Sequence, residues 1–153
     1  MALGLHIIAE FNNCSNKIID DILITESHLN KAAIIAGATI VKSVFHKFAP
    51  QGISGVVVIE ESHFAIHTWP ENNYAAVDLF TCSDKMDYTK ALEFLKEKFE
   101  CKNLDFQVIK RKANIQSNQE KVQSAQEKKQ GLKSNLGQKL FEQRQMEAKA
   151  VRK

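Results

Sequence analysis

Three short apolar segments lie close together between residues 55 and 82, and their spacing constrains the fold more than any other feature of the chain. They cover residues 55–59, 64–69 and 75–82, and each is rich in β-branched or aromatic side chains. Polar residues separate the first two segments, and the loop 70–73, Pro-Glu-Asn-Asn, follows the second. Connections of this length and composition join neighbouring antiparallel strands. The pattern therefore predicts an antiparallel meander.

Further strands are expected on both sides of the meander. Residues 5–11 and 39–48 are apolar and β-branched enough to form strands, and a last strand is expected at 104–109. Together with the meander, these segments give six strands in one chain.

Two helices interrupt the strands. The first is expected at 26–36, with Thr25 or Ser27 as its N-cap and Gly37 after its end. The second is expected at 87–99, where apolar residues recur on one helical face. The element order βαββββαβ predicts an α+β fold: a two-layer sandwich with a mainly antiparallel sheet and helices on one face.

A change of charge divides the chain near residue 110. Residues 110–153 hold 12 of the 21 basic residues and 4 of the 18 acidic ones, a net charge of +8, whereas residues 1–109 carry −5. After Lys110 the aromatic residues are reduced to Phe141. We expect one folded domain over residues 1–109 and a basic, partly helical or disordered tail over residues 110–153.

The apolar stretches and the cysteines indicate a cytoplasmic protein. No apolar run approaches the roughly 20 residues of a membrane-spanning helix, and the N-terminus lacks the basic region of a secretory signal. Cys14, Cys82 and Cys101 are odd in number and lack zinc-type spacing, which argues against a disulfide framework and a Cys-rich metal site. We expect a reducing compartment, with Cys14 and Cys101 as small buried hydrophobes of no assigned function.

Residues 46–82 carry the motifs that point to a function. In order, they contain HKFAPQG, SGVVVI, ESH, IHTWPE and YAAVDLFTC, and the chain opens with GLHIIAEFNNCS. This series resembles the signature region of the prokaryotic, pyruvoyl-dependent S-adenosylmethionine decarboxylases, and the resemblance covers roughly residues 4–109. It implies a proenzyme that cuts itself between Glu61 and Ser62, giving a β chain of residues 1–61 and an α chain that starts at residue 62.

The resemblance implies a role for each residue of the motifs. Ser62 attacks the Glu61 carbonyl to form an ester, whose elimination and hydrolysis leave an N-terminal pyruvoyl group that binds substrate as a Schiff base. His67 matches the processing base, Ser54 the second processing residue, and Cys82 the proton donor of decarboxylation. By burial habits alone, each of the last three would be structural, and their occurrence together favours the catalytic roles.

The expected turns agree with this grouping. A two-residue turn at Glu60 and Glu61 would place Ser54 directly across from His67. A four-residue loop at 70–73 would place Cys82 across from Glu61, beside the residue that becomes the cofactor.

The resemblance also implies a substrate pocket. Phe48 and Trp69 match pocket aromatics, which suit an adenine ring and a sulfonium cation, and Glu71 is a candidate partner for ribose hydroxyls. Two aromatic residues could equally be ordinary core, and Glu71 could simply occupy a turn. His46 and Lys47 receive no role.

The implied enzyme is a lyase of polyamine and spermidine biosynthesis that converts S-adenosylmethionine to its decarboxylated form. Its cofactor would be the covalent pyruvoyl group, without pyridoxal phosphate and without metal, since the i, i+4 pair His63 and His67 lies on an expected strand. We expect a homodimer of αβ pairs, no membrane partner, and nucleic-acid contact at most through the tail. Two alternatives remain: the same machinery acting on ornithine or arginine, and a non-catalytic binding homologue that uses its basic tail.

Overall fold

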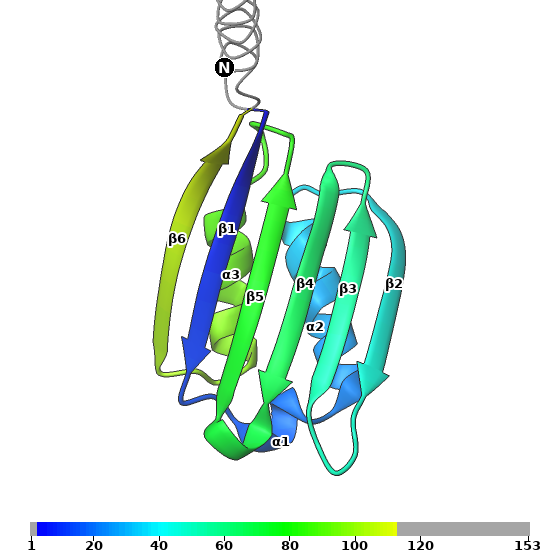
Figure 1. Ribbon diagram of the computed structural model, residues 1–153, viewed down its shortest axis with the longest axis vertical. Coiled ribbons are helices and arrows are strands. Elements are labelled where there is room, and N and C mark those ends of the chain that lie inside the picture. Colours follow the sequence, from blue (N-terminus) through cyan, green and yellow to red (C-terminus); the bar gives the residue numbers. More distant parts are fainter. Residues whose placement is uncertain (1–2, 113–153) are drawn as a thin grey trace, which may run out of the picture. The chain divides into compact units, whose positions relative to one another are not determined.

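The computed structural model describes residues 3–112, which form a six-stranded sheet with helices packed against it (Figure 1). The elements are β1 (Gly4–Asn12), α1 (Asn16–Ile19), α2 (Ile22–Ile35), β2 (Ile40–Lys47), β3 (Ile53–Ile59), β4 (Ser62–Trp69), the 3-10 helix η1 (Pro70–Asn72), β5 (Tyr74–Thr81), α3 (Tyr88–Lys98) and β6 (Asn103–Arg111).

The strands lie in the order β2-β3-β4-β5-β1-β6, and every neighbouring pair is antiparallel. The meander β3-β4-β5 is present as predicted. The first strand of the sequence, β1, lies between β5 and the last strand, β6. Helices α2 and α3 lie on the same side of the sheet (Figure 1). The predicted α+β sandwich is therefore confirmed.

The hydrophobic core lies between the sheet and the two long helices. Alternate residues of the central strands are fully buried, among them Ile7 and Phe11 of β1, Phe64 of β4 and Leu79 of β5. Opposite them, Leu95 of α3 is also fully buried. This period of two fits a sheet with one covered face, because successive side chains of a strand point to opposite sides.

Helix α2 begins four residues earlier than predicted. Its N-cap is Asp21, whose Oδ1 accepts hydrogen bonds from the backbone N–H groups of Leu23 and Ile24, at 3.0 Å each. The expected cap, Thr25, instead lies within the first turns of α2, where its side chain is buried and its hydroxyl donates to the Ile18 carbonyl at 3.2 Å. Leu23 is 76% exposed, so the first turn lacks the amphipathic pattern on which the prediction relied. The short helix α1 was not predicted.

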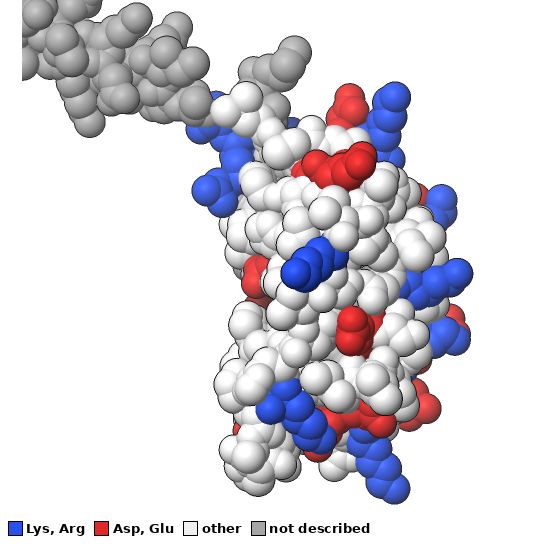
Figure 2. Space-filling model, turned by 90° about the vertical axis from the view of Figure 1, so that its right-hand side faces the viewer, with Lys and Arg blue, Asp and Glu red and all other residues white. Residues whose placement is uncertain are grey.

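Within the described residues 3–112, no helix covers the other face of the sheet. Val44, Val58 and Trp69 lie on this face and are half exposed. Figure 2 views the molecule from the side of β2: charged side chains gather on the helix side, at right, whereas the profile of the uncovered sheet face, at left, is mostly uncharged. The part of this face on β2 and β3 thus exposes apolar side chains, Val44 and Val58 among them.

Cys14 and Cys101 form a disulfide bond, with their Sγ atoms 2.20 Å apart. This corrects the prediction of unpaired cysteines and removes the observation behind the expected reducing compartment. The pairing was hidden in the sequence because 87 positions separate the two residues. The fold brings them together, since Cys14 follows β1 and Cys101 precedes β6, which is paired with β1.

The last strand is longer than predicted and ends at Arg111. Its last two residues pair with the start of β1, where Lys110 lies opposite Leu5 and Arg111 opposite Gly4. The expected character of the basic tail concerns residues that, from 113 onward, lie outside the described part. No helix within residues 3–112 is long and apolar enough to cross a membrane.

Candidate active site

Ser54 and His67 lie side by side on β3 and β4. They are direct partners in the strand register, as the two-residue turn predicted, and Ser54 Oγ lies 2.7 Å from His67 Nδ1. Both belong to the alternate set of strand positions that faces away from the helices. The pair forms a hydroxyl–imidazole contact that can exchange a proton with a group placed over this face.

The expected cleavage site lies at the opposite end of β4. Glu61 completes the tight turn after β3, and Ser62 is the first residue of β4, with a φ of 146°. A positive φ costs a residue that carries a Cβ of the order of 1–3 kcal/mol, so the backbone is strained at Ser62. Ser62 Oγ lies 3.2 Å from His63 Nδ1.

Cys82 lies next to this turn, as its predicted register required. Its backbone N–H donates to the Glu61 carbonyl at 3.0 Å, and its thiol is free and exposed. Its neighbour Thr81 is the strand partner of Ser62. The carbonyl that Ser62 would attack therefore already accepts a hydrogen bond, which polarises it.

The two groups of residues are far apart within one chain. Ser62 and His67 are separated by five positions of an extended strand, or about 16 Å at 3.3 Å per residue. Ser54 lies at the same distance, because it is paired with His67. A base must come within about 3 Å of the proton that it removes. One copy of the chain therefore does not bring His67 to Ser62.

The three predicted pocket residues lie together with Ser54 and His67. They line a cavity of about 360 Å³ where β3 begins and β4 ends. Its walls come from the turn after β2, from β3, from β4 and from η1, and comprise Phe48, Gln51, Gly52, Ile53, Ser54, His67, Thr68, Trp69 and Glu71. Phe48 is 49% exposed and Trp69 40%, so neither is ordinary core.

The aromatic wall of this cavity is built from stacked rings. Trp69 stacks on Tyr74 with ring centroids 5.3 Å apart, and His46 packs edge-on against Phe48 at 4.7 Å. The Tyr74 hydroxyl donates to a Glu10 carboxylate oxygen. Burial, together with that carboxylate, raises the pKa of Tyr74 to about 12, so the phenol keeps its proton at neutral pH.

The motifs did not reveal which residues hold the turn between β2 and β3. Asp20 Oδ1 accepts the Gly52 N–H at 2.9 Å, and Asp20 Oδ2 pairs with Lys47 Nζ at 3.0 Å. The hydrogen bond from the Gly52 N–H, and to a smaller degree the ion pair with Lys47, holds the pKa of Asp20 below its usual value. Gln51 Nε2 donates to Glu71 Oε2 at 3.0 Å. Gln51 stands inside the HKFAPQG motif and could have been noticed there, whereas nothing in the sequence marks Asp20.

Among residues 3–112, no group of three or more His, Cys, Asp or Glu side chains lies close enough together to hold a metal ion. His63 and His67 lie four positions apart on β4, and the His67 ring is hydrogen-bonded to Ser54.

Comparison with known families places this arrangement. Residues 5–112, nearly all of the folded part, match the family model described as S-adenosylmethionine decarboxylase. The chain belongs to the S-adenosylmethionine decarboxylase family. The match covers all the motifs of residues 46–82 and ends one residue after β6.

Individual members of the family agree with this assignment. An S-adenosylmethionine decarboxylase proenzyme of Fervidobacterium nodosum is 58% identical over 98 residues, which are 64% of this chain and 72% of that protein. The proenzyme of Thermotoga petrophila is 50% identical over 103 residues, 67% of this chain and 79% of its own. A crystal structure of the adenosylmethionine decarboxylase from Aquifex aeolicus superposes with a TM-score of 0.68 at 34% identity, covering 75% of this chain and 95% of that one.

Proposed function

We propose that the chain is a proenzyme that cuts itself between Glu61 and Ser62, and that the mature enzyme decarboxylates S-adenosylmethionine. The product is an aminopropyl donor for spermidine and other polyamines. The observation that carries the proposal is the family match over residues 5–112, a range that includes Glu61 and the strained residue Ser62. A cytoplasmic site of action stays a prediction.

Self-cleavage begins at the strained turn. Ser62 Oγ attacks the Glu61 carbonyl carbon, and the peptide C–N bond breaks to leave an ester and a free amine. The Cys82 N–H, which donates to this carbonyl, supports the attack by stabilising charge on its oxygen. Removal of the Ser62 α-proton then expels the Glu61 carboxylate, and hydrolysis of the remaining dehydroalanine releases ammonia.

We assign removal of the α-proton to His67 of a second copy of the chain. Within one copy, His67 lies about 16 Å along β4 from Ser62. A dimer that apposes the uncovered sheet faces would bring the Ser54–His67 pair of one copy to Ser62 of the other. The apolar side chains of that face, such as Val44 and Val58, support such an interface. The proposed assembly is a dimer of αβ pairs.

The pyruvoyl group that the family implies fits the residues around Ser62. When formed, it supplies a carbonyl that captures the substrate's α-amine and accepts the electrons released with CO2. The exposed Cys82 thiol lies beside the position of Ser62 and is assigned the proton that replaces the lost carboxylate.

The cavity with two aromatic walls is assigned to the adenosyl part of the substrate. Phe48 and Trp69 offer exposed ring surface to an adenine and to the sulfonium cation. Glu71 offers carboxylate oxygens to the ribose hydroxyls, and Gln51 fixes its position. Because the cavity also contains Ser54 and His67, it would face the Ser62 of the partner copy in the same dimer.

Two measurements test the proposal. Denaturing mass spectrometry under reducing conditions should show two chains, the second beginning with a pyruvoyl group, and Ser62→Ala should leave one uncut chain. His67→Ala should stall at the ester, so that its chain breaks on treatment with hydroxylamine.

Purified enzyme should release CO2 from S-adenosylmethionine. Higher catalytic efficiency on ornithine or arginine would instead make that amino acid the substrate. An uncut chain in active enzyme would refute the mechanism.

A further inference from the structure

The two bonded cysteines lie on different sides of the proposed cleavage site. Cys14 is in the segment 1–61, just after β1, and Cys101 is in the segment after Ser62, just before β6. Both side chains are buried, with 3% and 7% of their surface exposed. The remaining cysteine, Cys82, is free and exposed. Only the buried pair therefore connects the two segments through sulfur.

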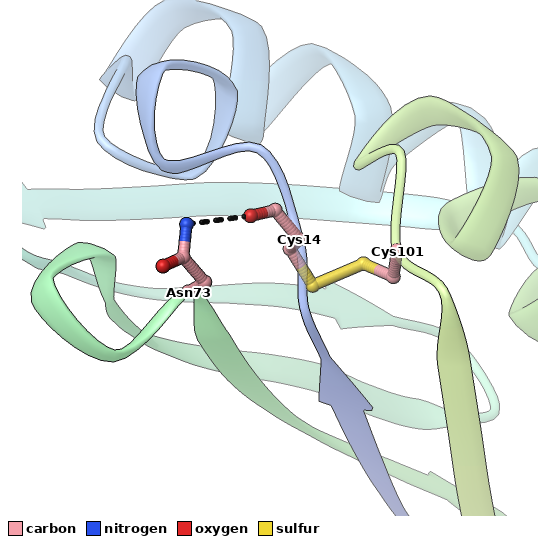
Figure 3. The surroundings of a disulfide bond; sticks show 3 residues. All are labelled: Cys14, Asn73 and Cys101. Carbon is pink, nitrogen blue, oxygen red and sulfur yellow. Dashed lines mark hydrogen bonds between the residues drawn. A yellow bond between two sulfur atoms is a disulfide. The ribbon is translucent and has the colours of Figure 1, made fainter.

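Hydrogen bonds hold Cys14 against the second segment, and Figure 3 shows the one from the Asn73 side chain. The Cys14 N–H donates to the Asn73 carbonyl at 2.8 Å, and Asn73 Nδ2 donates to the Cys14 carbonyl at 2.9 Å. On its other side, the Ser15 N–H donates to the Phe99 carbonyl at 2.9 Å. All three bonds cross from residues 1–61 to residues 62–153. They fix the position of Cys14 beside Cys101 independently of the Glu61–Ser62 bond.

We propose that the Cys14–Cys101 disulfide is a covalent bridge between the two chains of the mature enzyme. The proposal rests on the proposed self-cleavage. To form the bridge, two thiols lose two protons and two electrons to a dissolved disulfide such as oxidised glutathione, through a mixed disulfide. Once the peptide bond is cut, the bridge is the covalent connection that keeps the β and α chains together.

The bridge also anchors the loop that carries part of the substrate cavity. Asn73 follows η1 with a φ of 51° and bonds Cys14 through both its backbone and its side chain. Glu71 and Trp69 lie within four positions of it. Reduction should therefore raise the KM for the substrate, because the loop loses its covalently fixed neighbour.

The test uses the full-length enzyme equilibrated in a glutathione buffer, quenched with acid and alkylated in denaturant. Without reductant, mass spectrometry should show one species that contains both chains, with one alkyl group on Cys82. With reductant, the same sample should show two chains. Cys14→Ser should give two chains in both conditions, whereas the matched variant Cys82→Ser should keep them joined.

The outcomes separate this proposal from the one on which it rests. Cut chains that separate without reductant, or alkylation of Cys14 and Cys101 in the wild type, would overturn the bridge alone. A single chain that persists with reductant would overturn self-cleavage and the inter-chain bridge together. If Cys14→Ser fails to fold, peptide mapping of the wild type decides, since a Cys14–Cys101 peptide pair supports the bridge and its absence overturns it.

Discussion

Mixing two inactive variants tests whether His67 acts on the Ser62 of another copy. Ser62→Ala lacks the nucleophile, and His67→Ala lacks the base, so each homodimer should stay without pyruvoyl group. A mixed dimer contains one composite site with both native residues, because the Ser62 of one chain meets the His67 of the other. Its second site contains both substitutions and is inactive.

The expected yield follows from random assortment. With equal amounts of the two variants, half of the dimers are mixed, and each of these has one intact site of two. About a quarter of all sites should therefore be cut and active in a twofold-symmetric dimer. If Ser62 and His67 acted within one chain, every site would lack one of them, and the yield would be zero.

The assay is co-expression with two different affinity tags, sequential purification, and measurement of pyruvoyl-containing chain and CO2 release. The matched control mixes Ser54→Ala with His67→Ala. Both residues lie in the same pair, 2.7 Å apart, so each composite site of that mixed dimer lacks one of them. Failure of the first mixture to regain cutting would refute the proposed dimeric site, and recovery in the control would refute the assignment of Ser54 and His67 to one group.

Four other outcomes are expected. Cys82→Ala should still be cut but release CO2 about 100- to 10,000-fold more slowly, the usual cost of losing a general acid, and normal turnover would exclude the role. Burial, and to a smaller degree the charge of Lys98, lowers the pKa of His28, so the unfolded chain binds the proton more readily than the folded one. The free energy of unfolding should therefore fall as the pH drops below 6.5. Urea midpoints at two pH values measure the fall, with His28→Gln as control. Gly55→Ala should destabilise the fold by about 1–3 kcal/mol because its Cβ would clash with the Phe45 ring, and thermal unfolding that matched the wild type would contradict it. Deleting residues 113–153 should leave self-cleavage and dimerisation unchanged by mass spectrometry and gel filtration, and loss of either would place the tail within the fold.

The sequence predicted most of the sheet because its strands are short, apolar and separated by tight turns. The register between β3 and β4 followed from a single assumption, a two-residue turn at Glu60 and Glu61, and it placed Ser54 opposite His67 correctly. The register of a hairpin is determined by the length of its turn, and a short turn is visible in a sequence.

The sequence was a poorer guide where distant segments meet. Asp20 anchors Gly52 across 32 positions, and the partner of Cys14 lies 87 positions away, at Cys101. Neither pairing leaves a periodic or local pattern. The motif match grouped Ser62 with His67 by role, but it did not reveal that the same strand holds them about 16 Å apart.

The sheet order has a consequence for the timing of the cut. The segment before Ser62 supplies β1, β2 and β3, and the segment after it supplies β4, β5 and β6, yet β1 lies between β5 and β6. Three of the five strand pairings therefore join the two segments, namely β3 with β4, β5 with β1, and β1 with β6. A chain severed before folding would have to assemble this interlaced sheet from two diffusing fragments, at a rate that depends on concentration. Folding must therefore precede the cut, so that every chain that carries a pyruvoyl group has already inserted β1 between β5 and β6.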